Sequence, residues 1–398
     1  MNPRRILIFS LVYYPSFIGG AEVAIKEITD RISPSEVEFD MVTLRMDPSL
    51  PKYEKIGNIN VHRVGWTAKK GFSSSDPLPW YLHLNKYAFL LTGFLKAARL
   101  DRIRHYEAIW SLMATYNSFA ALFFKLVHPR TRFIFTLQDG DPIPYIKRRA
   151  LPLYPFFKMM FTRADHVQVI SSYLADWARE MSVKCPIMVV PNAVDYGLFS
   201  GKISDTEAAA LKEKLGKKEG DVFLITTSRL VAKNAIGDVI EALRYLPDNV
   251  KFLILGIGHE EASLKSQAKS LKLGDRVLFL GYVSHKEMPK YLQISEIFVR
   301  PSLSEGFGIS FVEAMAAGIP VIATRAGGIP DFLKDGETGL FCEAHNPKNI
   351  AQKVEKLIKD GESRKYIVRQ AREMVKDRYS WEKTARKMKE IFMIDLTV

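Results

Sequence analysis

Short apolar runs and longer amphipathic segments alternate from one end of the chain to the other. The runs are rich in Val, Ile, Leu and Phe and have the length of buried strands, whereas the longer segments repeat apolar residues at helical spacing. Strands that alternate with helices in this way predict parallel sheets built from strand–helix–strand units. We therefore expect an α/β protein.

The first half of the chain predicts one such series. We expect strands at Arg5–Tyr14, Phe39–Arg45, Ile59–Val64, Ala108–Met113, Arg132–Gln138, His166–Ser171 and Ile187–Pro191. Helices are expected near Ala21–Ile32, Trp80–His105, Asn117–Val127, Leu153–Thr162 and Ser172–Met181.

The pattern starts again after a helix at Ser204–Leu215 and a turn at Gly216–Gly220. The strands expected there are Val222–Ser228, Val250–Leu255, Arg276–Leu280, Glu296–Arg300, Pro320–Thr324 and Gly339–Cys342. This restart predicts two Rossmann-like domains, residues 1–200 and 201–379, facing across a cleft. Ligands of such sheets bind beyond the carboxyl ends of the strands.

Composition agrees with this division, because 398 residues suit two domains and 47% hydrophobic residues suit a globular chain. The net charge of +13 favours acidic partners such as nucleotide phosphates, anionic lipids or nucleic acid. Two distant cysteines, Cys185 and Cys342, argue against a disulfide framework. With no evident signal peptide or membrane span, we expect a cytoplasmic protein, with the inner face of the membrane as an alternative location.

The stretch from Arg300 to Ala323, R-P-S-L-S-E-G-F-G-I-S-F-V-E-A-M-A-A-G-I-P-V-I-A, carries the most specific chemistry. A strand leads into a Gly-rich loop that opens a helix, and a helix N-terminus with bare backbone favours anions. Glu305 and Glu313 would repel a bare phosphate, but carboxylates can accept hydrogen bonds from sugar hydroxyls. The loop therefore indicates a ligand that carries both phosphate and sugar.

This ordered run, with seven residues between Glu305 and Glu313, resembles the signature of the family 4 glycosyltransferases. The resemblance implies a retaining enzyme of the GT-B fold. It further implies that Glu305 holds donor-sugar hydroxyls and acts in catalysis, and that Glu313 holds the ribose. Gly306, Phe307 and Gly308 would supply backbone donors to the donor phosphates.

A basic loop follows the first strand of the second domain, at Thr227–Asn234. Arg229 offers a fork of donors to phosphate oxygens and Lys233 a compact charge, so both would bind the diphosphate and stabilise the departing group. The family usually has a lysine five residues after the arginine. Here Asn234 takes that position and Lys233 comes one residue earlier.

Weaker matches agree in order along the chain. Gly19 and Gly20, after the first strand, resemble the family's Gly-Gly loop opposite the donor phosphates. Val283, in Leu280-Gly281-Tyr282-Val283, resembles the loop whose backbone reads the base. Gly256-Ile257-Gly258 resembles the family's Gly-x-Gly turn, and Pro191–Asp195 the interdomain segment.

The family often carries a histidine after the strand that ends at Leu137, but this chain has Gln138 and Asp139 there. Gln138 cannot act as a base, so either Asp139 contributes on the acceptor side or the reaction needs no side-chain base. Asp139-Gly140-Asp141 also has the form of a metal motif of the other large glycosyltransferase fold. Two carboxylates alone rarely form a dedicated site, so we expect no metal and no cofactor.

Residues 143–163 contain basic and apolar residues and no acid. This segment predicts either a surface for anionic membrane or a helix packed into the core with solvated basic ends. The amphipathic segment from Ser380 resembles the closing helix of GT-B enzymes, which packs back on the first domain; the alternative is that it stays on the second.

We therefore expect a glycosyltransferase that moves a sugar from a UDP- or GDP-type donor to a glycan or lipid-linked acceptor in polysaccharide or glycolipid synthesis. The alternatives are a sugar-nucleotide epimerase of the same fold and a basic nucleic-acid-binding protein. An epimerase needs paired acid and base side chains, and we find no such pair. A nucleic-acid-binding protein needs clustered cations and exposed aromatics, for which only residues 143–163 give any sign, so we expect no nucleic-acid partner. An NAD-dependent oxidoreductase is excluded by the absence of Gly-x-Gly-x-x-Gly after the first strand.

Overall fold

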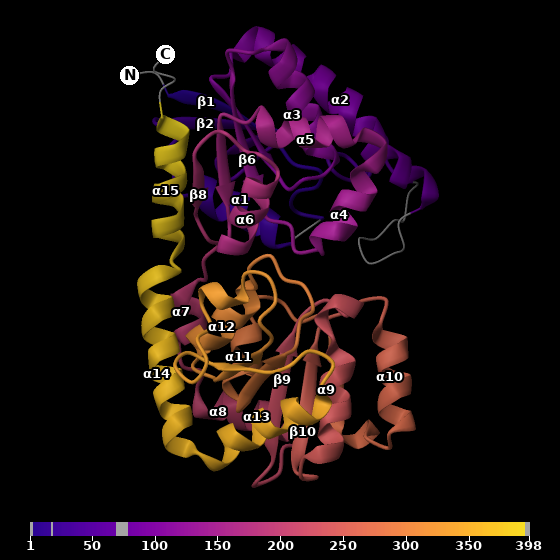
Figure 1. Ribbon diagram of the computed structural model, residues 1–398, viewed down its shortest axis with the longest axis vertical. Helices are drawn as coiled ribbons and strands as arrows, with labels where there is room; N and C mark the ends of the chain where they lie inside the picture. Colours follow the sequence, from indigo (N-terminus) through magenta and orange to yellow (C-terminus); the bar gives the residue numbers. More distant parts are fainter. Residues whose placement is uncertain (1–2, 17–18, 69–78, 395–398) are drawn as a thin grey trace. The chain divides into compact units, whose positions relative to one another are not determined.

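A computed structural model describes residues 3–16, 19–68 and 79–394 (Figure 1). The chain forms two compact units. Unit 1 contains Met1–Asn192 and Trp381–Val398, and unit 2 contains Ala193–Ser380. The domain boundary predicted from the sequence, between residues 200 and 201, lies a few residues after the start of unit 2.

Unit 1 is an eight-stranded sheet in the order β3-β4-β2-β1-β5-β6-β7-β8. Its strands are β1 (Arg4–Phe9), β2 (Val37–Leu44), β3 (Tyr53–Ile56), β4 (Ile59–Val64), β5 (Ala108–Leu112), β6 (Arg132–Leu137), β7 (His166–Val169) and β8 (Ile187–Val189). Its helices are α1 (Gly20–Thr29), α2 (Trp80–Arg104), α3 (Tyr116–Val127), α4 (Ile143–Ala150), α5 (Tyr154–Thr162), α6 (Ser172–Glu180) and α15 (Trp381–Met393).

Unit 2 is a six-stranded, fully parallel sheet in the order β11-β10-β9-β12-β13-β14. Its strands are β9 (Val222–Thr227), β10 (Val250–Leu255), β11 (Val277–Gly281), β12 (Ile297–Arg300), β13 (Val321–Ala323) and β14 (Leu340–Phe341). Its helices are α7 (Tyr196–Ser200), α8 (Asp205–Lys214), α9 (Ile236–Ala242), α10 (Glu261–Ser270), α11 (Met288–Gln293), α12 (Ile309–Ala317), α13 (Pro347–Lys359) and α14 (Gly361–Arg378).

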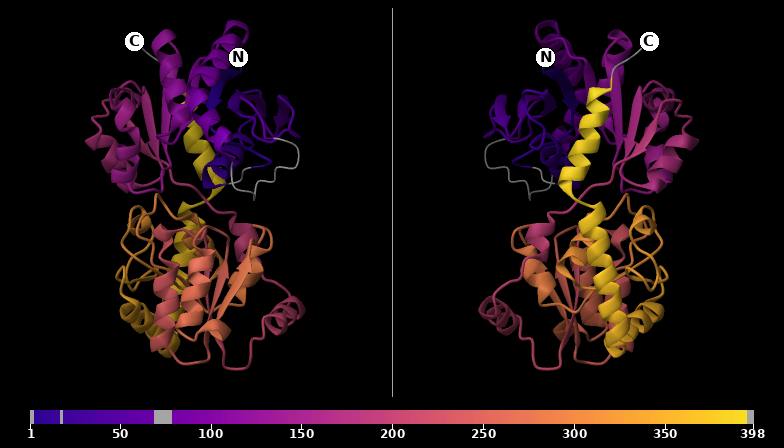
Figure 2. Two further views of the ribbon diagram at one scale, coloured as in Figure 1. Left: turned by 90° about the vertical axis from the view of Figure 1, so that its right-hand side faces the viewer. Right: turned by 90° about the vertical axis from the view of Figure 1, so that its left-hand side faces the viewer.

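Helices cover both faces of the sheet in each unit (Figure 2). In unit 2, α9 packs with α10 and α13, whereas α12 packs with α7, α11 and α14. Central strands such as β12 are buried along their whole length as a result. A strand covered on both faces needs apolar residues at successive positions, which explains the continuous hydrophobic runs of the sequence. The expected α/β fold with two Rossmann-like sheets is confirmed.

One local expectation is wrong, and two elements, β3 and α4, lie outside the expected set. The first strand ends at Phe9 rather than Tyr14, because the chain turns at Ser10, whose hydroxyl donates to the carbonyl oxygen of Val12. Strand β3 was not predicted, and it is antiparallel to β4. Residues 143–163 form two helices separated by a short 3-10 turn around Pro152. Helix α5 is the one expected near Leu153–Thr162, and α4 precedes it.

The last helix, α15, packs on unit 1. The ring of Phe392 lies against Phe39 and Trp110, with centroids 5.6 and 5.1 Å away. The Arg132 guanidinium donates to the carbonyl oxygens of Ile391 and Phe392. Strand β6 thus binds the carboxyl end of α15, where a cation complements the negative end of the helix. The closing-helix residues 395–398 lie outside the described residues.

We predict that Phe392→Ala will lower the free energy of unfolding of unit 1 by about 3–5 kcal/mol, because a fully buried aromatic ring leaves a cavity. All five tryptophans lie in the segments that form unit 1, so tryptophan fluorescence during urea unfolding reports on that unit. Met393→Ala removes an adjacent side chain that is exposed, and should change the midpoint little. Equal midpoints for the two variants would show that α15 contributes no packing energy.

Candidate active site in unit 2

The candidate site of unit 2 lies at the point where the strand order reverses. Strand β9 pairs with β10 on one side and with β12 on the other, and all three run parallel. Arg229 follows β9 and Glu305 follows β12, so both leave the carboxyl edge of the sheet beside the switch point. Ligands of open parallel sheets bind at such points, because the loops diverge and leave a crevice there.

Arg300, the last residue of β12, organises this edge. Its side chain is buried, and its guanidinium donates to Glu305 Oε2 at 3.0 Å and to the hydroxyl of Ser310 at 2.8 Å. It also donates to the carbonyl oxygen of Thr227 at the end of β9 and to the hydroxyl of Ser302. Two strands, the loop and the first turn of α12 are therefore tied to one planar group.

Burial lowers the pKa of the Arg300 guanidinium, and the carboxylates of Glu305 and Glu313 oppose that shift. A buried cation is stable only when it is paired and hydrogen-bonded. Glu305 supplies the charge through its Oε2 atom. The pairing fixes the orientation of Glu305, whose side chain is 17% exposed.

Two glycines set the path of the backbone around Glu305. Gly308, which caps the N-terminus of α12, has φ 97°, and a Cβ there would lie 2.6 Å from the ring of Phe311. A Cβ on Gly327 would lie 1.7 Å from the carbonyl oxygen of Glu305, the atom that accepts the N–H of Gly328. The ring of Phe307 packs on Phe332 and Tyr379 in the core, so its side chain anchors the loop.

The loop after β9 carries the predicted cations. Arg229 is exposed and forms no ion pair with any described residue, and Lys233 lies in a 3-10 turn, Ala232–Asn234. Asn234, which stands where the family usually has lysine, is buried and donates to the carbonyl oxygen of Arg229 at 2.7 Å. The Asn234 side chain thus holds the loop together by a hydrogen bond to its own backbone. Lys233, the preceding residue, takes the place of the family's lysine as the second cation of the loop.

Three hydroxyls at the same strand end have no hydrogen-bond partner among the described residues. They belong to Thr226, Thr227 and Ser228, and all three oxygens are buried. Buried polar atoms without a partner are uncommon in folded proteins, and these three cluster at the end of β9 next to Arg229.

Glu313 lies on the second turn of α12 and is almost fully buried. Its Oε1 is 2.8 Å from Nε2 of His285, a residue of the loop after β11. The ring of His285 meets Phe199 edge-on at 5.0 Å. No motif of the sequence points to His285, because its loop and α12 are brought together only by the fold.

The loops after β10 and β11 complete the edge. A Cβ on Gly256 or Gly258 would lie 1.9 or 2.2 Å from a carbonyl oxygen of Ser228 or Leu230, so both glycines allow the β10 loop to contact the β9 loop. The N–H of Gly256 donates to the carbonyl oxygen of Gly281. Val283, two residues beyond, is partly exposed. Unit 2 therefore gathers Arg229, Lys233, Val283, Glu305 with its glycine loop, and Glu313 on one edge.

The remaining predicted residues lie in unit 1. Gly19 and Gly20 are exposed at the start of α1, and the N–H of Gly19 donates to Glu22 Oε2 at 2.8 Å. The carboxylate of Glu22 thus takes a place at this helix N-terminus that a phosphate would need. Phe17 and Ile18 of the same motif lie outside the described residues.

Gln138 and Asp139 follow β6. Asp139 is buried and accepts the N–H of Ala114 at 3.1 Å, and Gln138 Oε1 is 3.5 Å from the side-chain amide of Asn192. Asp141 is exposed before α4. Within the described parts of the chain, no cluster of three or more His, Cys, Asp or Glu side chains could hold a metal ion.

Comparison with known proteins places this geometry in a family. The profile of the glycosyl transferases group 1 matches residues 207–374, and that of Glycosyltransferase Family 4 matches residues 18–197. The alpha-monoglucosyldiacylglycerol synthase of Acholeplasma laidlawii is 30% identical over 85% of this chain and 84% of its own. The chain belongs to glycosyltransferase family 4. The N-acetyl-alpha-D-glucosaminyl L-malate synthase of Bacillus anthracis is a further relative, 26% identical over 95% of this chain and 94% of its own.

Solved structures establish the fold of this glycosyltransferase. A sucrose-phosphate synthase from Thermosynechococcus elongatus superposes with a TM-score of 0.82 at 19% identity, covering 98% of each chain. The Anabaena protein HepE, solved with UDP and glucose, has a TM-score of 0.77 at 19% identity, covering 98% of this chain and 99% of its own. The expected GT-B fold is confirmed. No helix in the part of the glycosyltransferase that the structure describes is long and apolar enough to cross a membrane.

Proposed function

We propose that this glycosyltransferase takes its sugar from a nucleoside-diphosphate donor of the UDP or GDP type and retains the anomeric configuration. The main support is the carboxyl edge of the unit 2 sheet. There Arg229, Lys233, the N-terminus of α12, Glu305 and Glu313 lie near the switch point between β9 and β12. HepE has been solved with UDP and with UDP-glucose, which supports a uridine nucleotide as the donor class.

Each group has a distinct part in the proposed reaction. Arg229, Lys233 and the free N–H groups at the start of α12 would bind the diphosphate and stabilise the charge that grows on it as the glycosidic bond breaks. Glu305, held by Arg300, would accept hydrogen bonds from the donor sugar. Glu313 would keep Oε1 on His285 and offer its other oxygen to the ribose. The backbone at Val283 would meet the base.

The acceptor side is proposed from unit 1. Gln138 and Asp139 follow β6 at the carboxyl edge of its sheet, whereas Gly19 and Gly20, which follow β1, are assigned to the donor phosphates. Asp139 is held by the backbone of Ala114, so we propose that it positions this edge and that the leaving phosphate takes the proton of the acceptor hydroxyl. A glycan or a lipid-linked sugar is the acceptor class, and the name of the A. laidlawii relative supports a lipid.

We also propose that anionic membrane binds unit 1 through a surface wider than residues 143–163. Exposed apolar residues of α2 repeat at helical spacing: Trp80, Leu84, Tyr87, Leu91 and Leu95. At 3.6 residues per turn they fall within ~80° of the helix circumference. The buried side chains of α2 lie on the opposite side of the helix. This helix therefore presents one apolar face to the core and a second one outward.

The outer face of α2 is linked to α4 through Tyr116 of α3. The ring of Tyr87 contacts that of Tyr116, whose hydroxyl accepts from Arg149 at 3.4 Å. Phe157, Met160 and Phe161 are buried, as the core interpretation of 143–163 expects, but other apolar side chains there are exposed: Tyr145, Leu151, Leu153, Tyr154 and Phe156. We call the five exposed residues of this segment, together with the five of α2, the α2–α5 surface. Exposed cations on the same helices, such as Arg148 and Lys158, match anionic headgroups.

The first test replaces Glu305 by Gln. We expect transfer to fall at least a hundredfold. The melting temperature should fall as well, because Gln keeps the shape and still accepts from Arg300 but no longer neutralises that buried cation. Glu337→Gln, an exposed carboxylate of the same unit, is the control and should keep full activity. Transfer by Glu305→Gln within a few-fold of the parent, at matched stability, would remove the proposed role.

Arg229→Ala should reduce kcat more than it weakens binding of the nucleoside diphosphate, because charge on the bridging oxygen is greatest in the transition state. Losing one charge-assisted donor costs ~3 kcal/mol, or on the order of a hundredfold in rate. Lys233→Ala should act in the same direction and less strongly. Arg244→Ala, an exposed arginine after α9, is the control. A normal kcat with only a raised Kd would restrict Arg229 to binding.

Activity should persist in EDTA, since the proposed site neutralises the diphosphate with side-chain cations and helix N–H groups. Initial rates before and after dialysis against EDTA, with and without added Mg²⁺ or Mn²⁺, measure this. A complete loss restored only by metal would contradict the proposal and direct attention to Asp139 and Asp141.

The α2–α5 surface predicts co-sedimentation with vesicles that contain phosphatidylglycerol and weaker binding to phosphatidylcholine alone. Leu84→Asn with Leu91→Asn should reduce the bound fraction at least tenfold, since each leucine contributes ~1.5–3 kcal/mol when buried. Tyr245→Asn with Tyr366→Asn removes comparably exposed residues of unit 2 and should have no effect. Equal losses in both pairs would rule out this surface.

A further inference from the structure

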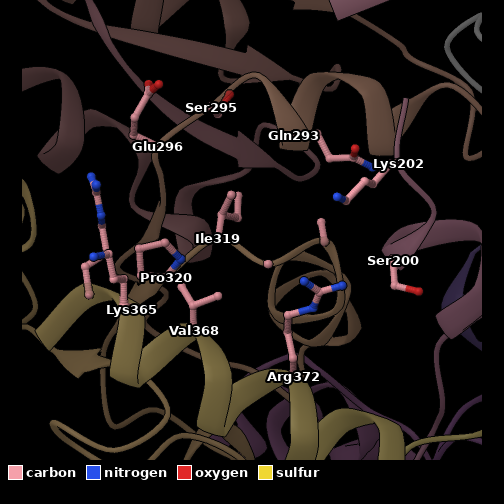
Figure 3. A pocket seen from close by; sticks show the side chains of 13 residues that line it. Ser200, Lys202, Gln293, Ser295, Glu296, Ile319, Pro320, Lys365, Val368 and Arg372 are labelled. Atoms are coloured by element: carbon pink, nitrogen blue, oxygen red, sulfur yellow. The ribbon is translucent and has the colours of Figure 1, made fainter. Parts of the chain in front are cut away.

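A cavity of about 470 Å³ opens in unit 2 at the opposite edge of the sheet from the candidate active site (Figure 3). Several of its lining residues, Ser295, Glu296 and Pro320, immediately precede β12 and β13. The wall on the other side comes from α14, and a third part from Ser200, the last residue of α7, and Lys202 beyond it. The proposed reaction uses none of these residues.

The cavity carries an excess of positive charge. Four of its lining residues are cations: Lys202, Arg364, Lys365 and Arg372. Its one carboxylate, Glu296, is already occupied, because Oε1 pairs with Lys217 at 2.6 Å and Oε2 accepts the N–H of Phe223 at 2.6 Å. Lys365 pairs with Glu362 outside the cavity.

Lys202, Arg364 and Arg372 form no ion pair with any residue that the structure describes, although Arg364 and Arg372 are partly buried. The guanidinium of Arg372 lies over Gly318 at the end of α12, and a Cβ there would be 3.3 Å from its Nη1. The C-terminus of a helix contributes about half a negative charge, so it offsets only a fraction of three cations. The cavity therefore retains a strong attraction for anions.

The spacing of the cations along α14 indicates how far apart the anionic groups of a ligand would lie. Arg364, Val368 and Arg372 are separated by four residues each and lie on one face of the helix. Eight residues correspond to ~12 Å along the helix axis, so the cationic groups are spread along the cavity. Between them the lining is apolar, with Val368 facing Ile319 and Pro320 (Figure 3). Arginine matches the oxygens of phosphate with paired donors.

We infer that this cavity binds a small organic molecule with a phosphate group at each end. One phosphate would contact Arg364, the other Arg372 and Lys202, and the body of the molecule would lie against Ile319 and Val368. This site is separate from the donor site and does not depend on the proposed transfer reaction.

Calorimetric titration with fructose 1,6-bisphosphate at low ionic strength tests the inference, with fructose 6-phosphate as the single-phosphate comparison. We expect saturable binding of one bisphosphate per chain and at least tenfold weaker binding of the monophosphate. Arg364→Gln with Arg372→Gln should weaken the bisphosphate at least tenfold. Arg369→Gln with Lys359→Gln removes the same charge from α14 and α13 outside the cavity and should change the Kd less than twofold.

Lys202→Gln leaves α14 intact and serves as the test if the double variant folds poorly. It should weaken bisphosphate binding several-fold. Binding must also survive in Arg229→Ala, which separates this cavity from the donor site. The inference is overturned if no saturable binding occurs, if the control pair weakens binding as much as the cavity pair, or if Arg229→Ala abolishes it. Failure of transfer activity would leave these results unchanged.

Discussion

The buried guanidinium of Arg300 is the interaction on which the candidate site depends. It joins the ends of β9 and β12 to the loop and to the first turn of α12, and it is itself neutralised by Glu305. A charge enclosed in this way is costly unless every partner is in place, so the network tolerates little variation in geometry. The residue that we assign to the donor sugar is therefore held before any sugar arrives. Such preorganisation is what an electrostatic site needs, because no free energy is spent on ordering it during the reaction.

The order and type of nearly all helices and strands follow from the sequence, because strands covered on both faces must be apolar throughout. The ends are less predictable, since a strand such as β1 stops where a hydroxyl turns the backbone. Strand β3 was not among the expected strands. Gly57-Asn58, between the two strands of this hairpin, is nevertheless a typical two-residue turn. The sequence of residues 143–163 does not reveal the boundary between α4 and α5, because basic and apolar residues continue on both sides of Pro152.

The residues of the candidate site were only partly predictable from the sequence. Residues within one continuous motif, such as Glu305 and Gly308, could be found from their spacing. Partners that meet only through the fold could not be found in this way. His285, in the loop after β11, contacts Glu313 of α12, and Arg300 donates to Thr227 at the end of the neighbouring strand. Asn234 is an intermediate case. The sequence showed that it replaces the usual lysine, but only the structure shows that it turns inward and closes its own loop.

The return of α15 to unit 1 has a consequence for biosynthesis. The surface around Phe39 and Trp110 remains uncovered until Phe392 has been made, and the whole of unit 2 is translated in between. At 5–20 residues per second, that interval is on the order of ten seconds or longer. Unit 2 is continuous and can fold as it emerges, whereas unit 1 waits with part of its core open to solvent. The nascent chain is thus most exposed to chaperones and proteases during this interval, and a stop codon before residue 381 would leave unit 1 permanently in that state.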